Sequence, residues 1–194
     1  MPRLDPRAPL VIDTRDLRRQ PGSLQEVRRQ VEAPEELGTD IIAVPAGSPV
    51  DVAVRLESVS EGVLVSGTAR ATASGACVRC LEPVSLPVEA AIQELFVYAD
   101  RAAHHHEVGA DEDEDEVREL VDDLIDLQPV LRDAVVPALP FQPVCRADCP
   151  GLCSDCGVAL ADDPDHRHDR IDPRWAALGG LPGASTHETR ETRT

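Results

Sequence analysis

The feature that constrains the fold most strongly is the cysteine-rich stretch Cys145-Arg-Ala-Asp-Cys149-Pro-Gly-Leu-Cys153-Ser-Asp-Cys156-Gly157. The two-residue gap between Cys153 and Cys156 lets one tight turn present two thiolates to a single ion, and Gly157 permits the positive φ that such turns use. Cys77-Val-Arg-Cys80 has the same gap but no following glycine. Because tetrahedral zinc needs four donors, each pair requires two more ligands from elsewhere in the chain.

The missing donors are present downstream, in Cys145 with Cys149 and in Asp165-His-Arg-His168. We predict two structural zinc ions with these ligand sets: Cys77, Cys80, Cys145 and Cys149 for the first, and Cys153, Cys156, His166 and His168 for the second. The rival assignment is a local quartet of Cys145, Cys149, Cys153 and Cys156, which leaves Cys77 and Cys80 free. Redox-active thiols or disulfides are a further alternative, and a solvated histidine pair needs no metal at all.

Composition restricts the classes of partner. The 194 residues carry a net charge of −17, every basic residue is arginine rather than lysine, and aromatic residues make up 2%. A surface with this charge repels phosphate, and few aromatic rings are available to stack on bases. A broad RNA-coating role is therefore excluded. The apolar content of 42% is in the range of globular proteins, with a core of Val, Leu, Ile and Ala.

Targeting and catalytic motifs are missing from the sequence. It has neither the apolar stretch of a signal peptide nor the roughly 18 apolar residues of a membrane span, so we expect a cytoplasmic protein with no membrane partner. Without lysine there is no phosphate-loop lysine, and G-x-G-x-x-G, G-x-S-x-G and H-E-x-x-H do not occur. We therefore expect neither enzymatic activity nor a small-molecule substrate.

Period-two alternation dominates the first half of the chain. Val50, Val52, Val54 and Leu56 share one face, and the alternation resumes over residues 63–71 after the turn Ser60-Glu-Gly62. A further strand-like run covers residues 83–98. We predict a mainly β domain over residues 1–100, an antiparallel sheet or small barrel with the Cys77/Cys80 turn. Residues 23–31 fit either a helix with a capping box or an edge strand.

The second half divides into three predicted parts. Residues 101–116 form an acidic flexible loop, residues 117–178 form helices and a Cys/His-rich hook packed on the β unit, and residues 179–194 form a disordered tail. Helical spacing predicts one helix over residues 117–127 and a second that begins near Asp126-Leu-Gln-Pro129 and ends before Pro140. A short helix is expected through Trp175. The predicted fold class is α+β.

Three ordered motifs resemble the YceD family, the large ribosomal RNA subunit accumulation proteins of bacteria and plastids. They are Cys77-Val-Arg-Cys-Leu-Glu-Pro83, Leu139-Pro140 leading into the Cys145–Gly157 stretch, and Ile171-Asp-Pro-Arg-Trp-Ala-Ala-Leu178. Many relatives carry Cys-x-Cys where this chain has His166-Arg-His168, which keeps metal-donor chemistry. The resemblance implies a role in large-subunit rRNA accumulation and large-subunit biogenesis, with no established catalysis.

A strongly acidic protein can assist a polyanion only through limited contacts. We predict few-point rRNA contacts through these arginines: Arg15, Arg18, Arg19, Arg79 and Arg146. The acidic run Asp111–Glu116 is expected to hold basic ribosomal proteins. The predicted partners are thus a large-subunit rRNA precursor or basic ribosomal proteins. The competing hypotheses are a zinc adaptor that binds only proteins, for example in transcription, and a thiol redox switch.

Overall fold

Alternating side chains along residues 49–76 build the central hairpin of the sheet, as predicted. Strand β5 (Pro49–Ser58) buries Val50, Val52, Val54 and Leu56 and exposes Asp51 and Arg55 between them. It pairs antiparallel with β6 (Gly62–Ala76), with Val54 opposite Gly67. The turn closes through a 2.9 Å hydrogen bond from the Val59 amide to the Gly62 carbonyl oxygen. The hairpin therefore presents one apolar face to the core.

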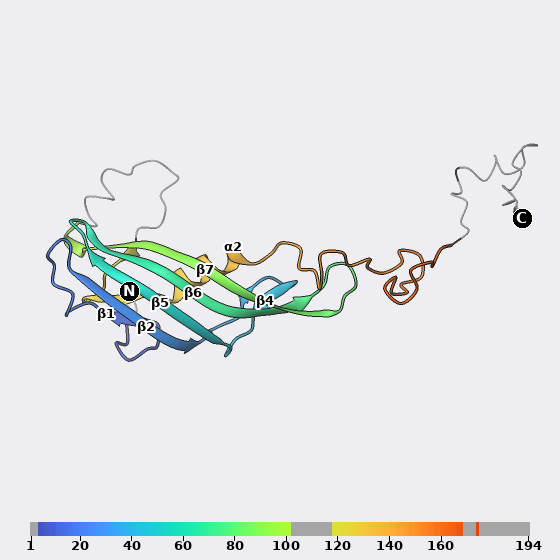
Figure 1. Ribbon diagram of the computed structural model, residues 1–194. Coiled ribbons are helices and arrows are strands. Elements are labelled where there is room, and N and C mark those ends of the chain that lie inside the picture. The colour runs from blue at the N-terminus through green and yellow to red at the C-terminus, as the bar shows by residue number, and fades with distance from the viewer. Residues whose placement is uncertain (1–3, 102–117, 169–173, 175–194) are drawn as a thin grey trace, which may run out of the picture. The chain divides into compact units, whose positions relative to one another are not determined.

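The computed structural model describes residues 4–101, 118–168 and 174 (Figure 1). One edge of β6 pairs with β7 (Pro83–Val97), and the opposite edge pairs first with β5 and then with β4 (Ile42–Val44). The remaining pairings are β2 (Leu24–Glu32) with β5, β3 (Leu37–Gly38) with β4, β8 (Arg118–Glu119) parallel to β7, and β1 (Val11–Asp13) with β9 (Leu124–Asp126). Residues 23–31, which fitted helix or strand, thus contribute the strand β2. The antiparallel sheet and α+β class agree with the prediction.

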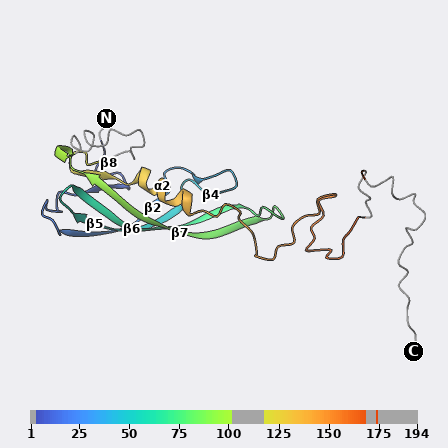
Figure 2. The same cartoon turned by 90° about the horizontal axis from the view of Figure 1, so that it is seen from above.

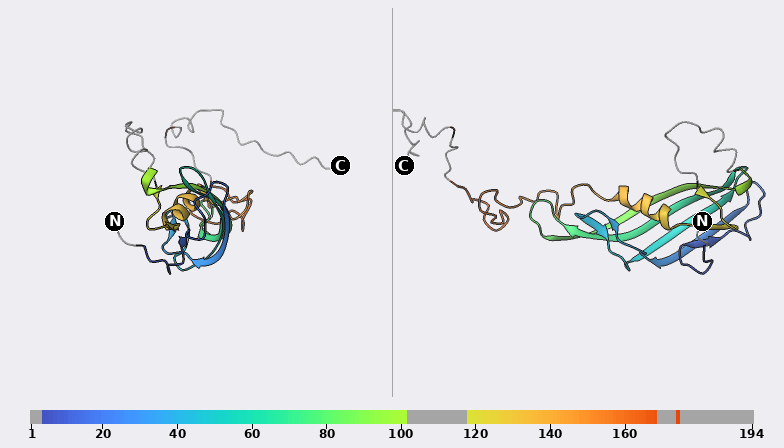
Figure 3. Two further views of the ribbon diagram at one scale, coloured as in Figure 1. Left: turned by 90° about the vertical axis from the view of Figure 1, so that its left-hand side faces the viewer. Right: turned by 180° about the vertical axis from the view of Figure 1, so that it is seen from behind.

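Helix α2 (Gln128–Ala138) has the start and end that its sequence predicts. Asp126 accepts a 2.9 Å hydrogen bond from the Gln128 amide, and Pro129 occupies the first turn. The helix ends directly after Pro137, which cannot continue the hydrogen-bond ladder. It buries Val130, Leu131 and Val135. Figure 2 and the left panel of Figure 3 show that α2 lies in the hollow of the curved sheet.

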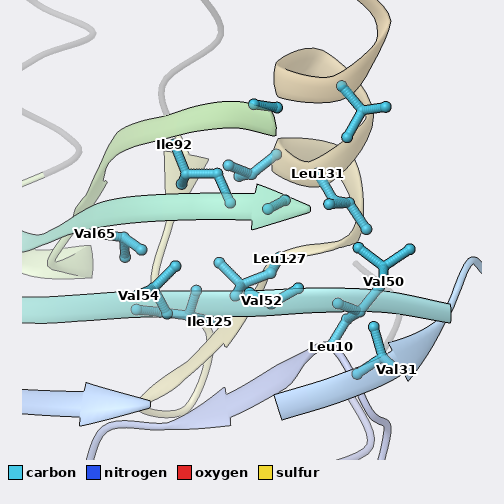
Figure 4. Close-up of a cluster of buried hydrophobic side chains, with 14 of the residues drawn as sticks. Leu10, Val31, Val50, Val52, Val54, Val65, Ile92, Ile125, Leu127 and Leu131 are labelled. Atoms are coloured by element: carbon cyan, nitrogen blue, oxygen red, sulfur yellow. The ribbon is translucent and has the colours of Figure 1, made fainter. Parts of the chain in front are cut away.

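The core is aliphatic, as the shortage of aromatic residues requires. Side chains from the sheet, from β9 and from α2 interlock around Leu131 and Ile125, which are 1% and 0% exposed (Figure 4). Among the described residues, the buried aromatic side chains are Phe96 and Tyr98, and the Tyr98 hydroxyl is 3.0 Å from the hydroxyl of Ser58. Full burial of each Val, Leu or Ile side chain contributes about 1.5–3 kcal/mol. This packing holds α2, and the chain that leaves it, against the sheet.

The predicted helix over residues 117–127 is wrong: the described part of this segment forms β8 and β9. Between the two strands Asp122 and Asp123 adopt positive φ values of 54° and 61°, which reverse the chain. The strands pair with partners distant in sequence, since Ile125 faces Ile12 across the β1–β9 ladder. These long-range pairings override an apolar spacing that is compatible with a helix.

Contacts divide the chain into one unit of Met1–Cys149 and a second of Pro150–Thr194. Strands β8 and β9 and helix α2 belong to the same unit as the sheet. Except for Arg101 and Arg174, the predicted acidic loop, tail and Trp175 helix lie outside the described residues. Within the described residues, no helix has both the length and the apolar character needed to cross a bilayer.

Candidate metal centres

The first centre joins two chain segments that lie more than sixty residues apart. Cys77 and Cys80 occupy the turn between β6 and β7, and Cys145 and Cys149 follow α2. All four Sγ atoms lie within 4.8 Å of one another. Cys77 and Cys149 are buried, with 0% and 4% of their surface exposed, whereas Cys145 is exposed. The centre therefore has a closed inner side and one ligand at the surface.

Hydrogen bonds between backbone groups shape the turn that carries Cys77 and Cys80. The Leu81 amide donates to the Cys77 carbonyl oxygen at 2.9 Å, and the Cys77 amide donates to the Glu82 carbonyl oxygen at 2.8 Å. Leu81 adopts a left-handed conformation with φ of 62°. Two cysteines separated by two residues are thereby held in one tight turn, the knuckle arrangement predicted from their spacing.

Protein hydrogen bonds also connect the two halves of the first centre. The Val78 amide donates to the Pro143 carbonyl oxygen at 2.9 Å. Nη1 of Arg79 donates to the carbonyl oxygens of Ala147 and Cys149, at 3.3 and 3.0 Å. The Arg79 guanidinium therefore fixes the 145–149 turn against the 77–80 turn. The sequence did not predict this role, because every residue has a backbone carbonyl and the sequence does not indicate which of them an arginine will bind.

The sulfur separations fit a tetrahedral zinc ion. With a Zn–S bond of about 2.3 Å, neighbouring sulfurs of a tetrahedron lie about 3.8 Å apart. The Cys77–Cys149 and Cys80–Cys145 Sγ separations are 3.9 and 3.7 Å. The four thiol groups thus have the chemistry and the spacing that zinc requires.

The second centre has the same local backbone pattern. The Gly157 amide donates to the Cys153 carbonyl oxygen at 2.9 Å, and the Cys153 amide donates to the Val158 carbonyl oxygen at 2.8 Å. Gly157 adopts a φ of 75°, which glycine tolerates without steric cost. This turn therefore reproduces the Cys77–Cys80 turn bond for bond, with glycine in the place of Leu81.

Two histidines complete the second centre. Nε2 of His166 and Nε2 of His168 lie 3.2 and 3.3 Å from Sγ of Cys156, and 2.9 Å from each other. These separations are a few tenths of an ångström below the edges of a mixed N/S zinc tetrahedron, about 3.4–3.6 Å. All four donor atoms, including Sγ of Cys153, lie within 4.8 Å of one another.

A carboxylate supports one histidine from behind. Nδ1 of His166 lies 3.5 Å from a carboxylate oxygen of Asp163. Metal-binding histidines commonly donate their second ring N–H to a carboxylate, which leaves the other nitrogen free for the ion. Asp163 was not among the predicted site residues, although its position three residues before His166 places it within reach.

Two thiols of the first centre have pKa values shifted in opposite directions. Burial raises the pKa of Cys77, but the backbone amides of Cys145, Cys80 and Arg79 outweigh it and lower the pKa to about 6. The neighbouring Cys149 side chain and burial raise the pKa of Cys145 to about 12. Four adjacent sulfurs do not all ionise together without a cation between them.

In the second centre, the Cys153 thiol is acidified by its own turn. The backbone amides of Asp155 and Cys156 point at its sulfur and lower its pKa to about 6. A thiolate at neutral pH is the form in which cysteine binds metal ions. Both centres thus hold one cysteine that is already prepared as a ligand.

The structure brings the eight predicted donors together in the two predicted groups. Cys77 and Cys80 lie with Cys145 and Cys149, and Cys153 and Cys156 lie with the two histidines. The local quartet of Cys145, Cys149, Cys153 and Cys156 is not the grouping observed. Both clusters can therefore hold a metal ion.

The arginines proposed for rRNA contact do not gather on one surface. Arg15 and Arg19 lie in the loop after β1, where Arg15 pairs with Asp13, and Arg19 pairs with Asp123 at 3.0 Å and stacks over Tyr98. Arg18 of this loop is exposed. Tyr98 and the Cys77–Cys80 turn flank opposite ends of β7, a strand about 45 Å long. At the turn end, Arg79 binds the carbonyl oxygens described above and Arg146 pairs with Asp148.

Comparisons with known proteins relate this chain to a defined family. The family model described as "Large ribosomal RNA subunit accumulation protein YceD" matches residues 65–182, which include all eight donors. An uncharacterized protein of Mycobacterium tuberculosis is 46% identical over 96% of this chain and 87% of its own length.

Two further relatives extend the match. An uncharacterized protein of Mycobacterium leprae is 40% identical over 95% of this chain and 83% of its own length. The uncharacterized protein YlbN of Bacillus subtilis is 29% identical over 75% and 80% of the two chains. No solved structure matches the chain. The family match and these relatives agree with the resemblance carried by the cysteine motifs, and the chain belongs to the YceD family.

Proposed function

We propose that this protein is a non-catalytic, zinc-binding factor that promotes accumulation of large-subunit rRNA and biogenesis of the large ribosomal subunit. The family name implies the rRNA role. The observation that carries the zinc-binding part is the first centre, in which donors from the β6–β7 turn and from the segment after α2 approach within bonding range of one ion. A metal ion there would fasten the β6–β7 turn to the segment that follows α2.

Zinc is the metal that these donors favour. Thiolate and imidazole groups in four-donor sets are typical of structural zinc, and Asp163 behind His166 supplies the expected outer support. When bound, zinc supplies cross-linking between chain segments. Since four protein ligands leave no open position for a water molecule, the arrangement favours a structural rather than a catalytic metal.

Charge favours contact with basic ribosomal proteins over a broad RNA interface. The net charge is −17, and four of the five arginines proposed for RNA contact already bind groups within the chain. An acidic surface attracts basic partners and disfavours partners that carry negative charge. We therefore propose a basic large-subunit protein as the primary partner, with rRNA contacted at few points.

The experiment is to delete the gene and measure rRNA in a sucrose gradient. The proposal predicts a reduced ratio of large-subunit to small-subunit rRNA and an accumulation of large-subunit precursors. The wild-type chain should restore the ratio, whereas Cys145→Ala with Cys149→Ala should not. An unchanged ratio in the deletion strain overturns the rRNA role. If the protein in a cell extract sediments with RNA polymerase instead of with large-subunit precursors, the adaptor hypothesis is favoured. A zinc-free protein with reactive thiols favours the redox switch.

A further inference from the structure

Four large apolar side chains are exposed at the end of the sheet that carries the first centre. Ile41, Val78, Leu81 and Phe141, which we call the knuckle patch, are 50%, 41%, 67% and 98% exposed. Backbone hydrogen bonds hold their segments together: the Ala76 amide donates to Ile41, and the Val78 amide donates to Pro143, two residues after Phe141. Leu81 directly follows the metal donor Cys80. The patch therefore belongs to a surface that the centre itself organises.

Leucine is sterically unfavourable at position 81. Its φ of 62° places its Cβ against the backbone, a strain that leucine rarely accepts. Gly157 occupies the equivalent position of the second turn, with φ of 75° and the same two hydrogen bonds. The turn thus folds without a side chain at this point. Because the Leu81 side chain is two-thirds exposed, burial within the chain does not compensate for the strain.

Phe141 is equally unexplained by the fold. The chain has only two phenylalanines; Phe96 is 3% exposed in the core, whereas Phe141 is 98% exposed. In a protein whose core is short of aromatic residues, an aromatic ring outside the core contributes nothing to internal packing. Large apolar residues gathered at a surface are typical of binding sites, and aromatic residues are common anchors there.

The charges around the patch indicate the chemistry of its partner. Asp40 adjoins Ile41 and Glu82 adjoins Leu81, and both acidic residues are exposed. The neighbouring Arg79 and Arg146 are bound to backbone carbonyls and to Asp148. Hydrogen bonds to neutral carbonyl oxygens leave the charge of Arg79 in place, so the three acids Asp40, Glu82 and Asp148 outnumber Arg79 and Arg146 by one. This small acidic excess has the same sign as the net charge of −17, and both favour a basic protein over RNA phosphate.

We propose that the knuckle patch is the docking surface for an apolar segment of a basic large-subunit ribosomal protein, with Leu81 and Phe141 as its anchors. This inference rests on the proposed function and specifies its partner and contact surface. Formation of the first centre positions both anchors, since Leu81 adjoins Cys80 and Phe141 precedes Cys145 by four residues.

The test uses the zinc-loaded full chain, immobilised, with two separate probes: the proteins extracted from purified large ribosomal subunits, and protein-free large-subunit rRNA. The variants are Phe141→Ala, Leu81→Gly and Leu81→Asn, because glycine and asparagine tolerate the left-handed conformation. Leu24→Ala, which truncates a 56% exposed leucine on β2, is the matched control. Zinc content and melting temperature are measured for every variant.

The wild-type chain and Leu24→Ala should retain one or more basic ribosomal proteins, identified by mass spectrometry. Phe141→Ala and both Leu81 variants should lose about tenfold or more of that binding while keeping their zinc and melting temperature. Equal binding by all variants, loss in the control alone, or Phe141-dependent binding of rRNA in place of protein overturns the proposal. The deletion strain tests the proposed function separately. If its rRNA ratio is normal, the proposed function fails, whereas binding that depends on Leu81 and Phe141 would still show that the knuckle patch is a docking surface.

Discussion

Sγ of Cys80 lies 3.7 Å from Sγ of Cys145, although 65 residues separate them along the chain. Between them the chain completes β7, β8 and β9 and helix α2, so the contact closes a loop around much of the core. Removing the metal should therefore loosen this end of the molecule before it disturbs the sheet. In hydrogen exchange after chelation, amides of residues 77–82 and 143–149 should lose protection, while those of the β5–β6 ladder keep it. Equal loss in both regions would contradict a local role for the metal.

Arg79 should control how firmly the first centre holds its ion. Arg79→Gln removes the two guanidinium bonds to Ala147 and Cys149, which fix the 145–149 turn. We expect zinc to pass to a competing chelator about tenfold faster or more, as when outer-shell partners of a metal site are removed. Arg146→Gln is the control because Arg146 pairs only at the surface, with Asp148. If the two variants release zinc equally, Arg79 has no positioning role.

Thiol reactivity should follow the pKa values in the zinc-free protein. Cys153, with a pKa of about 6, is a thiolate at pH 7, whereas Cys145, with a pKa of about 12, is a neutral thiol. Iodoacetamide should therefore label Cys153 first, although Cys145 is the more exposed. A lowered pKa means that protonation occurs as the pH falls through 6, so labelling of Cys153 should slow about tenfold by pH 5. Peptide mass spectrometry that finds Cys145 labelled faster would refute this order.

Substitutions at Leu81 and Gly157, the left-handed residues of the two turns, should change zinc affinity in different ways. Gly157→Leu imposes a side chain on a φ of 75° and should cost about 1–2 kcal/mol in the second centre, or roughly tenfold in zinc affinity. Leu81→Gly relieves the same strain in the first centre and should leave its zinc affinity unchanged or raised. Competition titration with a chromogenic chelator measures both. A loss of affinity in Leu81→Gly would show that leucine serves the fold there.

Packing of α2 should dominate the stability of the larger unit. Leu131 is 1% exposed between the helix and the sheet, and Leu131→Ala should lower the free energy of unfolding by about 2–5 kcal/mol. Leu24→Ala, at a largely exposed position on β2, should change it by less than about 0.5 kcal/mol. Urea denaturation compares the two directly. Similar losses in both variants would mean that α2 is not a principal contact of the core.

The sequence predicted features whose determinants are local. Alternation of valines placed Val50 and Val54 on the buried face, and the Asp126–Pro129 signal placed the start of α2. The two-residue gaps of Cys77/Cys80 and Cys153/Cys156 predicted two metal-binding turns, because such a gap constrains a turn strongly. The spacing favoured the observed grouping of the other four donors but left the local quartet open, and the tertiary structure decides between them.

Features that depend on distant partners escaped prediction. Residues 118–119 and 124–126 form strands because they pair with β7 and β1, and no local pattern reveals these partners. The bonds of Arg79 end on backbone carbonyls, and the positive φ of Leu81 contradicts the preference of leucine. Each of these belongs to the tertiary structure rather than to the neighbouring residues.

Zinc content of the variant that carries Cys153→Ala and Cys156→Ala tests the central claim most directly. Two independent centres predict one zinc ion per chain in this variant, held by Cys77, Cys80, Cys145 and Cys149, and its loss when Cys77→Ala is added. Native mass spectrometry of the purified full chain gives the count. A variant that binds no zinc, while the wild-type chain does, would contradict the first centre and restore the local quartet.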